Sequence, residues 1–416
     1  MNIKMLSQIT GLTVLLTDVF LVVPLLIALY DGQPRNIAAY AVTMVLMAVV
    51  GLALVLFSRG GSRSFYAQEG FAATGISWIV LSLFGALPFC LSGEIPNYVD
   101  ALFEIVSGFT TTGASILSDV EALSRCNLYW RSFSHWLGGM GILVFLLAVV
   151  PEARKSAGSG MYLMRAESPG PSVGKLTPHL RQTALILYYL LLLRQFKSVF
   201  KNEELRLYAG IAVGAIVLIT IDISRMYGSV REALHHAAFQ VSSIMTTTGF
   251  ASVDFEQWPA FSKAVLLALM FVGACAGSTA GGLKVSRVLL LLKSIRRTVR
   301  RAIHPRRVQS VRMDGRVVDA AVLNNVNAYL AVYCVILLLS FVVVSVDGYS
   351  IGTNLSAVAS CFNNVGPGFE LVGATGNYGH YSDVSKLVLT ADMLLGRLEI
   401  FPLLALFSPD TWSRKR

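Results

Sequence analysis

Charged residues are scarce in this sequence. Asp, Glu, Lys and Arg make up 14% of its 416 residues, whereas an ordinary soluble domain contains about 25%. Hydrophobic residues make up 55%, and the mean hydropathy is +0.63. This composition excludes an ordinary soluble protein and predicts an integral membrane protein. Apolar runs of the length needed to cross a bilayer lie near residues 8–30, 36–57, 74–93, 135–151, 207–223, 261–276, 322–346 and 385–408.

The sequence is also poor in the patterns that build catalytic, metal or nucleotide sites. Its five cysteines and six histidines show no spacing typical of metal ligands. No Ser-His-Asp or paired-carboxylate pattern is evident, although a triad assembled only in three dimensions stays open. No Walker A motif is present, and no dinucleotide-binding glycine motif follows a strand. We therefore predict a protein that is not an enzyme, with a polytopic membrane enzyme as the less favoured alternative.

The basic residues cluster in a few loops. The formal net charge is +10, which could indicate nucleic-acid binding, but basic clusters between apolar runs are the positive-inside signature of cytoplasmic loops. The clusters lie at Arg154–Arg181, Arg194–Arg206, Arg287–Arg316 and Ser413–Arg416. We expect a multi-pass protein of a bacterial inner membrane, surrounded by lipid bilayer, with both termini cytoplasmic and no nucleic-acid partner.

Three short polar stretches recur within the apolar sequence. Each has a serine six residues before a glycine, and they lie at Ser107–Gly113, Ser243–Gly249 and Ser360–Gly366. Each follows a segment that fits a short helix and precedes a long apolar run. One such stretch alone would most simply be a helix end with a glycine cap. Three in the same context indicate an ion filter, because only backbone carbonyls outside helix hydrogen bonding can replace the water shell of an ion.

The sequence predicts an all-α membrane protein built from repeats of a helix, a half-helix, a polar loop and a second helix, here called M1-P-M2 units. Half-helices are expected at 99–109, 229–245 and 354–362, each aiming the negative end of its dipole at the loop beyond it. We expect a helix pair at 1–66, a first unit at 67–155, a remnant of a second at 156–204, a third at 205–316 and a fourth at 317–416.

The second unit is incomplete. Between Arg181 and Arg194 the apolar part spans only about 12 residues, or roughly 18 Å as a helix. Both flanks are basic, so an even number of crossings is required. We infer that this unit lacks its middle near residues 187–191, through a deletion or through omission of a segment from the sequence as given, and we favour omission. A Cα–Cα distance there much longer than the normal value of about 3.8 Å would support omission.

Several motifs resemble the TrkH family, the membrane subunits of bacterial Trk potassium uptake systems within the Trk/Ktr/HKT superfamily. The leading helix pair favours this family over the shorter KtrB type. Besides the segments Ser107–Ala114 and Met245–Phe250 at the first and second polar stretches, the motifs are His135–Gly141, Gly277–Lys284, Asn363–Gly368 and Leu395–Ile400. The resemblance covers nearly the whole chain.

The resemblance implies pseudo-fourfold M1-P-M2 repeats around one central pore per subunit, and assembly of two subunits into a homodimer. It implies that the transported ion is K⁺, with no organic cofactor, and that a cytosolic nucleotide-binding TrkA-like subunit regulates the pore. The residues whose carbonyls would coordinate K⁺ are Thr111, Thr112, Gly113, Thr247, Thr248, Gly249, Asn364, Val365 and Gly366. The second filter loop of the family falls in the missing segment.

The resemblance also implies a gate below the filter. Its loop would be Gly277, Ser278, Thr279, Ala280, Gly281 and Gly282, which interrupt the M2 helix of the third unit. Close helix packing by small residues is the alternative for this segment. Arg397 would project into the pore near that loop and raise a barrier to cations. Its alternative is an arginine paired with a carboxylate or with carbonyls at a helix end.

Two further alternatives stay open. The basic helix Lys284–Arg301 is either a positive-inside helix end or a docking surface for the regulator. The ion preference also has two readings. Glycine at each visible filter position favours K⁺, since Na⁺-preferring members of the superfamily replace one of them with serine, but a Na⁺-permeable or Na⁺-coupled K⁺ transporter is the alternative.

Overall fold

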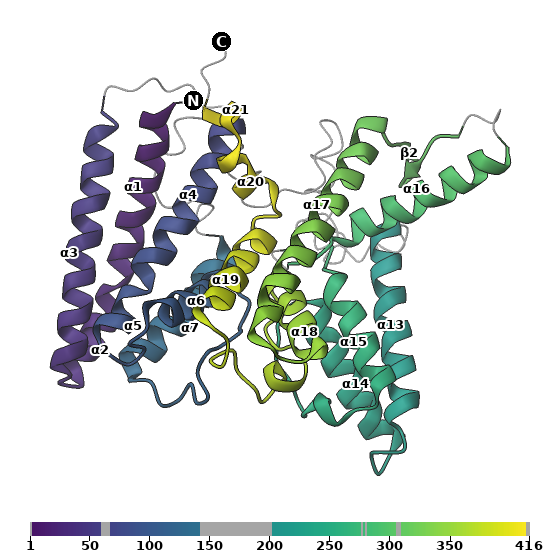
Figure 1. Cartoon of the computed structure of the whole chain (residues 1–416), viewed down its shortest axis with the longest axis horizontal. Helices are drawn as coiled ribbons and strands as arrows, with labels where there is room; N and C mark the ends of the chain where they lie inside the picture. Colours follow the sequence, from purple (N-terminus) through teal and green to yellow (C-terminus); the bar gives the residue numbers. More distant parts are fainter. Residues whose placement is uncertain are drawn as a thin grey trace, which may run out of the picture. The chain divides into compact units, whose positions relative to one another are not determined.

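The chain is described here from a computed structural model that covers residues 2–59, 67–141, 202–275, 278, 281–304 and 309–412. It divides into two compact units (Figure 1). Unit 1 comprises Met1–Ser168 and Gly376–Arg416, and unit 2 comprises Pro169–Thr375. The fourth M1-P-M2 segment is therefore shared between them. The predicted discontinuity at 187–191 lies outside the described residues.

The described residues are mostly helical, as the sequence predicts for a membrane protein. Unit 1 contains α1 (Ile3–Phe20), α2 (Val22–Tyr30), α3 (Pro34–Phe57), α4 (Ala67–Gly85), α5 (Leu87–Leu91), α6 (Tyr98–Phe109), α7 (Arg125–Met140), α19 (Asp383–Arg397), α20 (Phe401–Phe407) and α21 (Pro409–Trp412). Unit 2 contains α13 (Glu203–Ile223), α14 (Val230–Met245), α15 (Ala260–Phe271), α16 (Val285–Ile303), β1 (Arg312–Met313), β2 (Arg316–Val317), α17 (Ala320–Val344) and α18 (Ile351–Phe362). Short 3₁₀ turns lie at Phe255–Gln257, Ser345–Asp347 and Glu370–Val372.

Five described helices are long and apolar enough to cross a membrane. They are Ile3–Tyr30, Pro34–Phe57, Glu69–Leu91, Glu203–Ile223 and Ala320–Asp347. Each coincides with a predicted apolar run. Many of their side chains face outward, as expected of helices whose surroundings are lipid rather than water.

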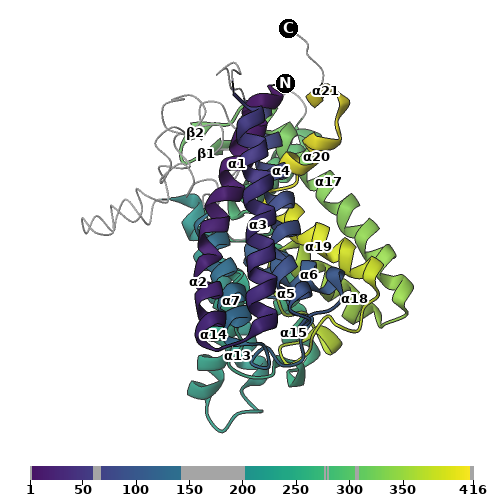
Figure 2. The same ribbon diagram turned by 90° about the vertical axis from the view of Figure 1, so that its left-hand side faces the viewer.

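The leading helix pair packs through glycine. Figure 2 shows α1 and α3 side by side along most of their length. A Cβ added to Gly11 of α1 would lie 2.9 Å from the carbonyl oxygen of Gly51 in α3. In a bilayer, close backbone approach of this kind replaces the hydrophobic driving force that water supplies to soluble helices.

A buried polar cluster joins α3 to the first M1-P-M2 unit. Tyr40 donates a hydrogen bond to Asn127 Oδ1 (2.7 Å), and Asn127 Nδ2 donates to Ser92 Oγ (3.1 Å). The carboxylate of Glu94 accepts from the Ser124 backbone N–H at 3.0 Å. Burial raises the pKa of Glu94, but hydrogen bonds led by those from Ser124 outweigh it and hold that pKa below its usual value.

Two predicted M2 helices are interrupted. The helix expected over 261–276 ends as α15 at Phe271, and α16 begins only at Val285. The apolar run predicted near 385–408 is not one continuous helix, because α19 ends at Arg397 and α20 begins at Phe401. At this break Glu399 and Ile400 have φ of 55° and 66°, and the Ile400 N–H donates to Leu395 O at 2.8 Å. These φ angles and this hydrogen bond are typical of a helix that ends in the left-handed conformation.

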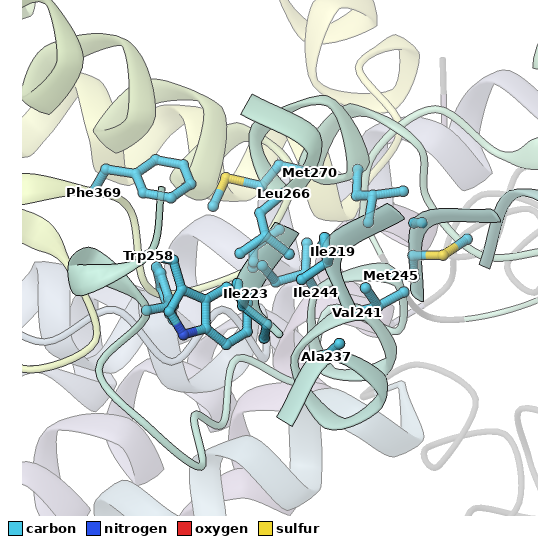
Figure 3. Packing of buried hydrophobic residues seen from close by; sticks show 14 of the residues in the cluster. Ile219, Ile223, Ala237, Val241, Ile244, Met245, Trp258, Leu266, Met270 and Phe369 are labelled. Carbon is cyan, nitrogen blue, oxygen red and sulfur yellow. The ribbon is translucent and has the colours of Figure 1, made fainter. Parts of the chain in front are cut away.

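Within unit 2, an apolar cluster holds α13, α14 and α15 together. Figure 3 shows Ile223, Trp258 and Leu266 within it. Phe369 and Val365, which belong to the segment after α18, pack on the same cluster. The chain that follows α18 is therefore fixed against the third M1-P-M2 unit.

Candidate ion site

The three half-helices all begin with a side-chain cap. Asn97 accepts from the Val99 N–H, Ser229 from the Glu232 N–H and Ser350 from the Thr353 N–H. Such caps satisfy backbone donors that have no partner within the helix. The half-helices are α6, α14 and α18, and their C-terminal ends lie at the three polar stretches.

All three polar stretches leave the helix through the same hydrogen-bond pattern. The N–H groups of Thr112, Thr248 and Val365 donate to the carbonyls of Ser107, Ser243 and Ser360, at 2.9, 2.8 and 2.9 Å. The residue before each donor bonds to the carbonyl three positions earlier. This pair of bonds is a Schellman motif, which ends a helix abruptly. The backbone carbonyl of the serine in each motif is therefore the acceptor of the bond that ends the helix.

The left-handed residue in each motif is not glycine. Thr111, Thr247 and Asn364 have φ of 57°, 53° and 54°. A β-branched residue in this region is an outlier, with a cost of order 1–3 kcal/mol that the surrounding structure must offset. Gly113, Gly249 and Gly366, predicted as filter residues, lie two positions later and also have positive φ.

Side chains brace each loop. The hydroxyls of Thr110 and Thr112 are 2.7 Å apart. Those of Thr246 and Thr248 are 2.8 Å apart. In the last loop Asn363 replaces the first threonine, and its Oδ1 accepts a hydrogen bond from Tyr333 at 2.7 Å. These hydrogen bonds therefore fix the conformation of the loops and the positions of their backbone carbonyls.

A buried ion pair supports the first loop. Glu104 of α6 is fully buried, and its carboxylate accepts from Arg131 Nε at 2.5 Å. The same carboxylate accepts from Ser115 Oγ at 3.0 Å and from the Ile116 N–H at 3.0 Å. One side chain therefore joins α6, the chain beyond the first polar loop and α7.

The loops at Thr247–Gly249 and Asn364–Gly366 are called the third and fourth loops, after the predicted M1-P-M2 units to which they belong. Within unit 2, these two loops touch. A Cβ added to Gly249 would lie less than 3.0 Å from the carbonyl oxygen of Val365 and 3.2 Å from Pro367 Cδ. Real Cβ atoms essentially never approach an atom so closely. Only glycine therefore allows these two backbones to meet in this way.

The segment between α15 and α16 lies against the fourth loop. Gly273 N–H donates to Leu283 O at 2.9 Å, and Leu283 N–H donates to Phe271 O at 3.2 Å, so the two ends of the segment run side by side. A Cβ on Gly281 would clash with Asn363 O. Lys284 Nζ donates to the Ser278 carbonyl at 2.9 Å. Of the predicted gate residues, Gly277, Thr279 and Ala280 lie outside the described residues.

Arg397 is buried at the end of α19. Its Nη2 donates to the carbonyl of Gly138 in α7 at 2.5 Å, and its guanidinium lies 5.7 Å from the ring centre of Trp78. Gly138 packs directly on the backbone of Phe109, the last residue of α6. A helix-end carbonyl therefore holds Arg397 beside the base of the first loop.

Glu370, in the 3₁₀ turn Glu370–Val372 outside the membrane spans, contacts the start of α18. Glu370 accepts hydrogen bonds from Ser350 and from Thr353 Oγ1, the latter at 2.7 Å. These bonds lower the pKa of Glu370 below its usual value, and the bond from Ser350 has the largest effect. The Glu370 N–H also donates to Glu256 at 2.8 Å, which joins the predicted third and fourth M1-P-M2 units.

The structure divides the predicted filter residues between the two units. Thr111, Thr112 and Gly113 belong to unit 1, whereas the third and fourth loops meet within unit 2. Sequence reasoning missed Glu104, Arg131, Tyr333 and Glu370. A signal existed for Glu104, because it is a charge within a segment expected at membrane depth. In the described part of the chain, no group of three or more His, Cys, Asp or Glu side chains is placed to hold a metal ion.

Comparison with known families agrees with this architecture. The model of the TrkH family, described as cation transport proteins, matches residues 35–196 and 215–415. The chain belongs to the TrkH family. A TrkH crystal structure from Vibrio parahaemolyticus superposes with a TM-score of 0.82 at 28% identity, covering 99% of this chain and 100% of that chain. The all-α membrane fold predicted from the sequence is confirmed.

Curated members of the TrkH family align over almost the full chain. The Trk system potassium uptake protein TrkH of Salmonella typhimurium is 31% identical, covering 99% of this chain and 100% of its own length. TrkH of Halomonas elongata is also 31% identical, covering 100% of both chains. These alignments extend over 490 and 491 positions, more than the 416 residues of this chain. The relatives therefore contain positions that have no counterpart here. They are named as transporters and not as enzymes, in line with the prediction.

Proposed function

We propose that this protein takes up K⁺ across a bacterial inner membrane through a gated, channel-like pore with a filter of backbone carbonyls. The observation that carries the proposal is the shared backbone pattern of the three loops. Each places its non-helical peptide groups just beyond the C-terminal end of a half-helix, where the negative end of the helix dipole favours a cation. The names of its relatives, potassium uptake proteins, support K⁺ as the ion.

The proposal assigns separate roles to the other parts. Carbonyls of the loop residues Thr111–Gly113, Thr247–Gly249 and Asn364–Gly366 coordinate the ion. The segment Gly277–Gly282 is the gate, supported by the contact of Gly281 with the backbone of Asn363. Arg397 adds a positive charge at membrane depth, which opposes cation passage while the gate is closed.

We further propose that two copies form a homodimer and that a cytosolic, nucleotide-binding TrkA-like subunit controls the gate. The name "Trk system" in the relatives supports partnership with other Trk components. Because α16 follows the gate segment directly, a partner that contacts α16 would act on the gate through the backbone.

A direct flux measurement tests the proposed transport. The purified protein in liposomes, with and without the cytosolic subunit, should carry K⁺ and Rb⁺ at least about tenfold faster than Na⁺ and Li⁺, a difference of about 1.4 kcal/mol. Liposomes without protein provide the background. Equal rates for K⁺ and Na⁺ would favour the Na⁺-permeable alternative, and flux of neither ion would contradict the proposal.

We propose that the positions present in the relatives but absent here belong to the middle of the second M1-P-M2 unit, including its filter loop. Trypsin cuts after Arg181 and Arg194, so a continuous chain yields the peptide Gln182–Arg194. If a segment has been omitted between Tyr188 and Tyr189, mass spectrometry of the purified protein will not find this peptide, but will find peptides that extend beyond each tyrosine. Detection of the intact peptide would instead establish a deletion.

A further inference from the structure

Helix α16 is anchored by its first half only. The Ser286 N–H donates to Glu204 of α13 at 3.1 Å, and the Arg287 guanidinium lies 4.0 Å from the ring centre of Tyr329 in α17. Leu290 packs in an apolar cluster with the β-hairpin and the first turns of α17. Beyond Ser294 the residues of α16 are mostly exposed.

The position of α16 relative to two membrane spans places it at a membrane surface. Its contacts with α13 and α17 involve the N-terminal ends of both helices, and Lys293 bonds to Glu203, the first residue of α13. Figure 1 shows α16 crossing obliquely near these ends rather than running parallel to the spans. The ends of spanning helices lie at the boundary between acyl chains and headgroups.

The exposed half of α16 carries two distinct faces. Leu292, Ile295, Val299 and Ile303 follow one another at intervals of three or four residues, and their exposed fractions are 51%, 51%, 54% and 65%. At 3.6 residues per turn they form one apolar stripe. An adjoining face carries Arg296, Arg297, Arg300 and Arg301, and α16 contains no acidic residue.

We propose that the second half of α16 lies in the inner-leaflet interface and binds anionic phospholipids. The apolar stripe enters the boundary of the acyl chains, and the arginines contact headgroup phosphates. A large basic face beside a narrow apolar stripe is the pattern of helices that lie in a membrane surface. Clustered arginines at the cytoplasmic side attract anionic lipid. A soluble acidic protein would pair with the arginines, but it would leave the four aliphatic side chains unexplained.

Cysteine accessibility tests this orientation in the full chain. Val299→Cys probes the apolar stripe, and Arg301→Cys probes the opposite side of the same helical turn. Each variant is reconstituted in vesicles of phosphatidylcholine, with or without phosphatidylglycerol, and a water-soluble maleimide is loaded on both sides of the bilayer by freeze–thaw. Peptide mass spectrometry locates the label, so the five natural cysteines can stay in place.

We expect the maleimide to label Val299→Cys at least about tenfold more slowly in phosphatidylglycerol vesicles than in detergent. The decrease in labelling rate should be smaller in vesicles of phosphatidylcholine alone. Arg301→Cys should react similarly in all three environments. Adding Arg296→Gln and Arg300→Gln to Val299→Cys should remove the dependence on phosphatidylglycerol. Unchanged elution on size exclusion verifies that each variant is folded.

Three outcomes would overturn the proposal. Equal reactivity of Val299→Cys in detergent and in phosphatidylglycerol vesicles would mean that the stripe does not enter the bilayer. Equal protection in both kinds of vesicle would exclude recognition of anionic headgroups. Protection in detergent, produced by the cytosolic subunit or by a second copy of the chain, would assign the stripe to a protein interface. None of these readouts depends on ion transport.

Discussion

Replacing Gly249 with alanine is expected to reduce K⁺ uptake at least about tenfold, equivalent to 1.4 kcal/mol or more of added barrier. The new Cβ would lie closer to the Val365 carbonyl oxygen than real Cβ atoms come to any neighbour. Val365 is itself a proposed filter residue, so relief of the clash must displace the backbone that contacts the ion. Uptake in liposomes at matched protein content measures the effect.

Gly348→Ala is the matched control for this substitution. Gly348 has the same φ of 78° as Gly249, but an added Cβ there would meet nothing within 4 Å among the described residues. Both variants therefore carry the cost of a left-handed alanine, about 1–2 kcal/mol, and only one carries the clash. Uptake by Gly348→Ala should remain close to that of the unmodified protein. Equal loss in both variants would show that backbone strain, and not contact between the third and fourth loops, causes the defect.

The half-helices could be predicted from sequence with good accuracy because their signals are local. The segment expected over 99–109 is observed as Tyr98–Phe109, and that over 229–245 as Val230–Met245. A capping Asn or Ser precedes each one, and a polar loop follows. The third begins earlier than expected, at Ile351 rather than residue 354, because Ser350 rather than a later residue provides the cap.

Features that depend on tertiary contacts were missed. The break between α19 and α20 uses left-handed Glu399 and Ile400, residues whose own preferences do not predict a helix end. The small hairpin had a local signal, since Asp314-Gly315 is a typical two-residue turn. The basic residues around this turn predict a cytoplasmic loop, but they do not predict a hairpin. Packing of Met313 against Val322 and Val326 stabilises this hairpin.

In the candidate site, too, features with a local sequence signal could be predicted and features that depend on tertiary contacts could not. The glycines of the three polar loops could be found by their spacing, whereas the left-handed conformation of Thr111 could not, because threonine rarely adopts it. The pairing of Gly249 with Val365 joins residues more than a hundred positions apart. No single-sequence pattern encodes such a contact. The support of the first loop by Glu104 likewise depends on Arg131 being brought across from the next helix.

That buried pair gives the second large prediction. Arg131→Met should lower the free energy of unfolding by about 3–5 kcal/mol, because it leaves the fully buried Glu104 carboxylate without its cationic partner. Arg125→Met is the control, since Arg125 pairs with Asp31 at 3.1 Å while its side chain is 74% exposed. Exposed pairs contribute at most about 1 kcal/mol. Thermal unfolding in detergent measures both variants.

The double variant Glu104→Gln with Arg131→Met separates charge from packing. If the cost of Arg131→Met arises from an uncompensated buried charge, neutralising Glu104 should restore part of the lost stability, because glutamine keeps an oxygen that can accept from Ser115 and the Ile116 N–H. K⁺ uptake should recover in parallel, since these two bonds fix the chain that leaves the first proposed filter loop. A double variant less stable than Arg131→Met alone would contradict this account, and would mean that the shape of the arginine supports the loop more than its charge does.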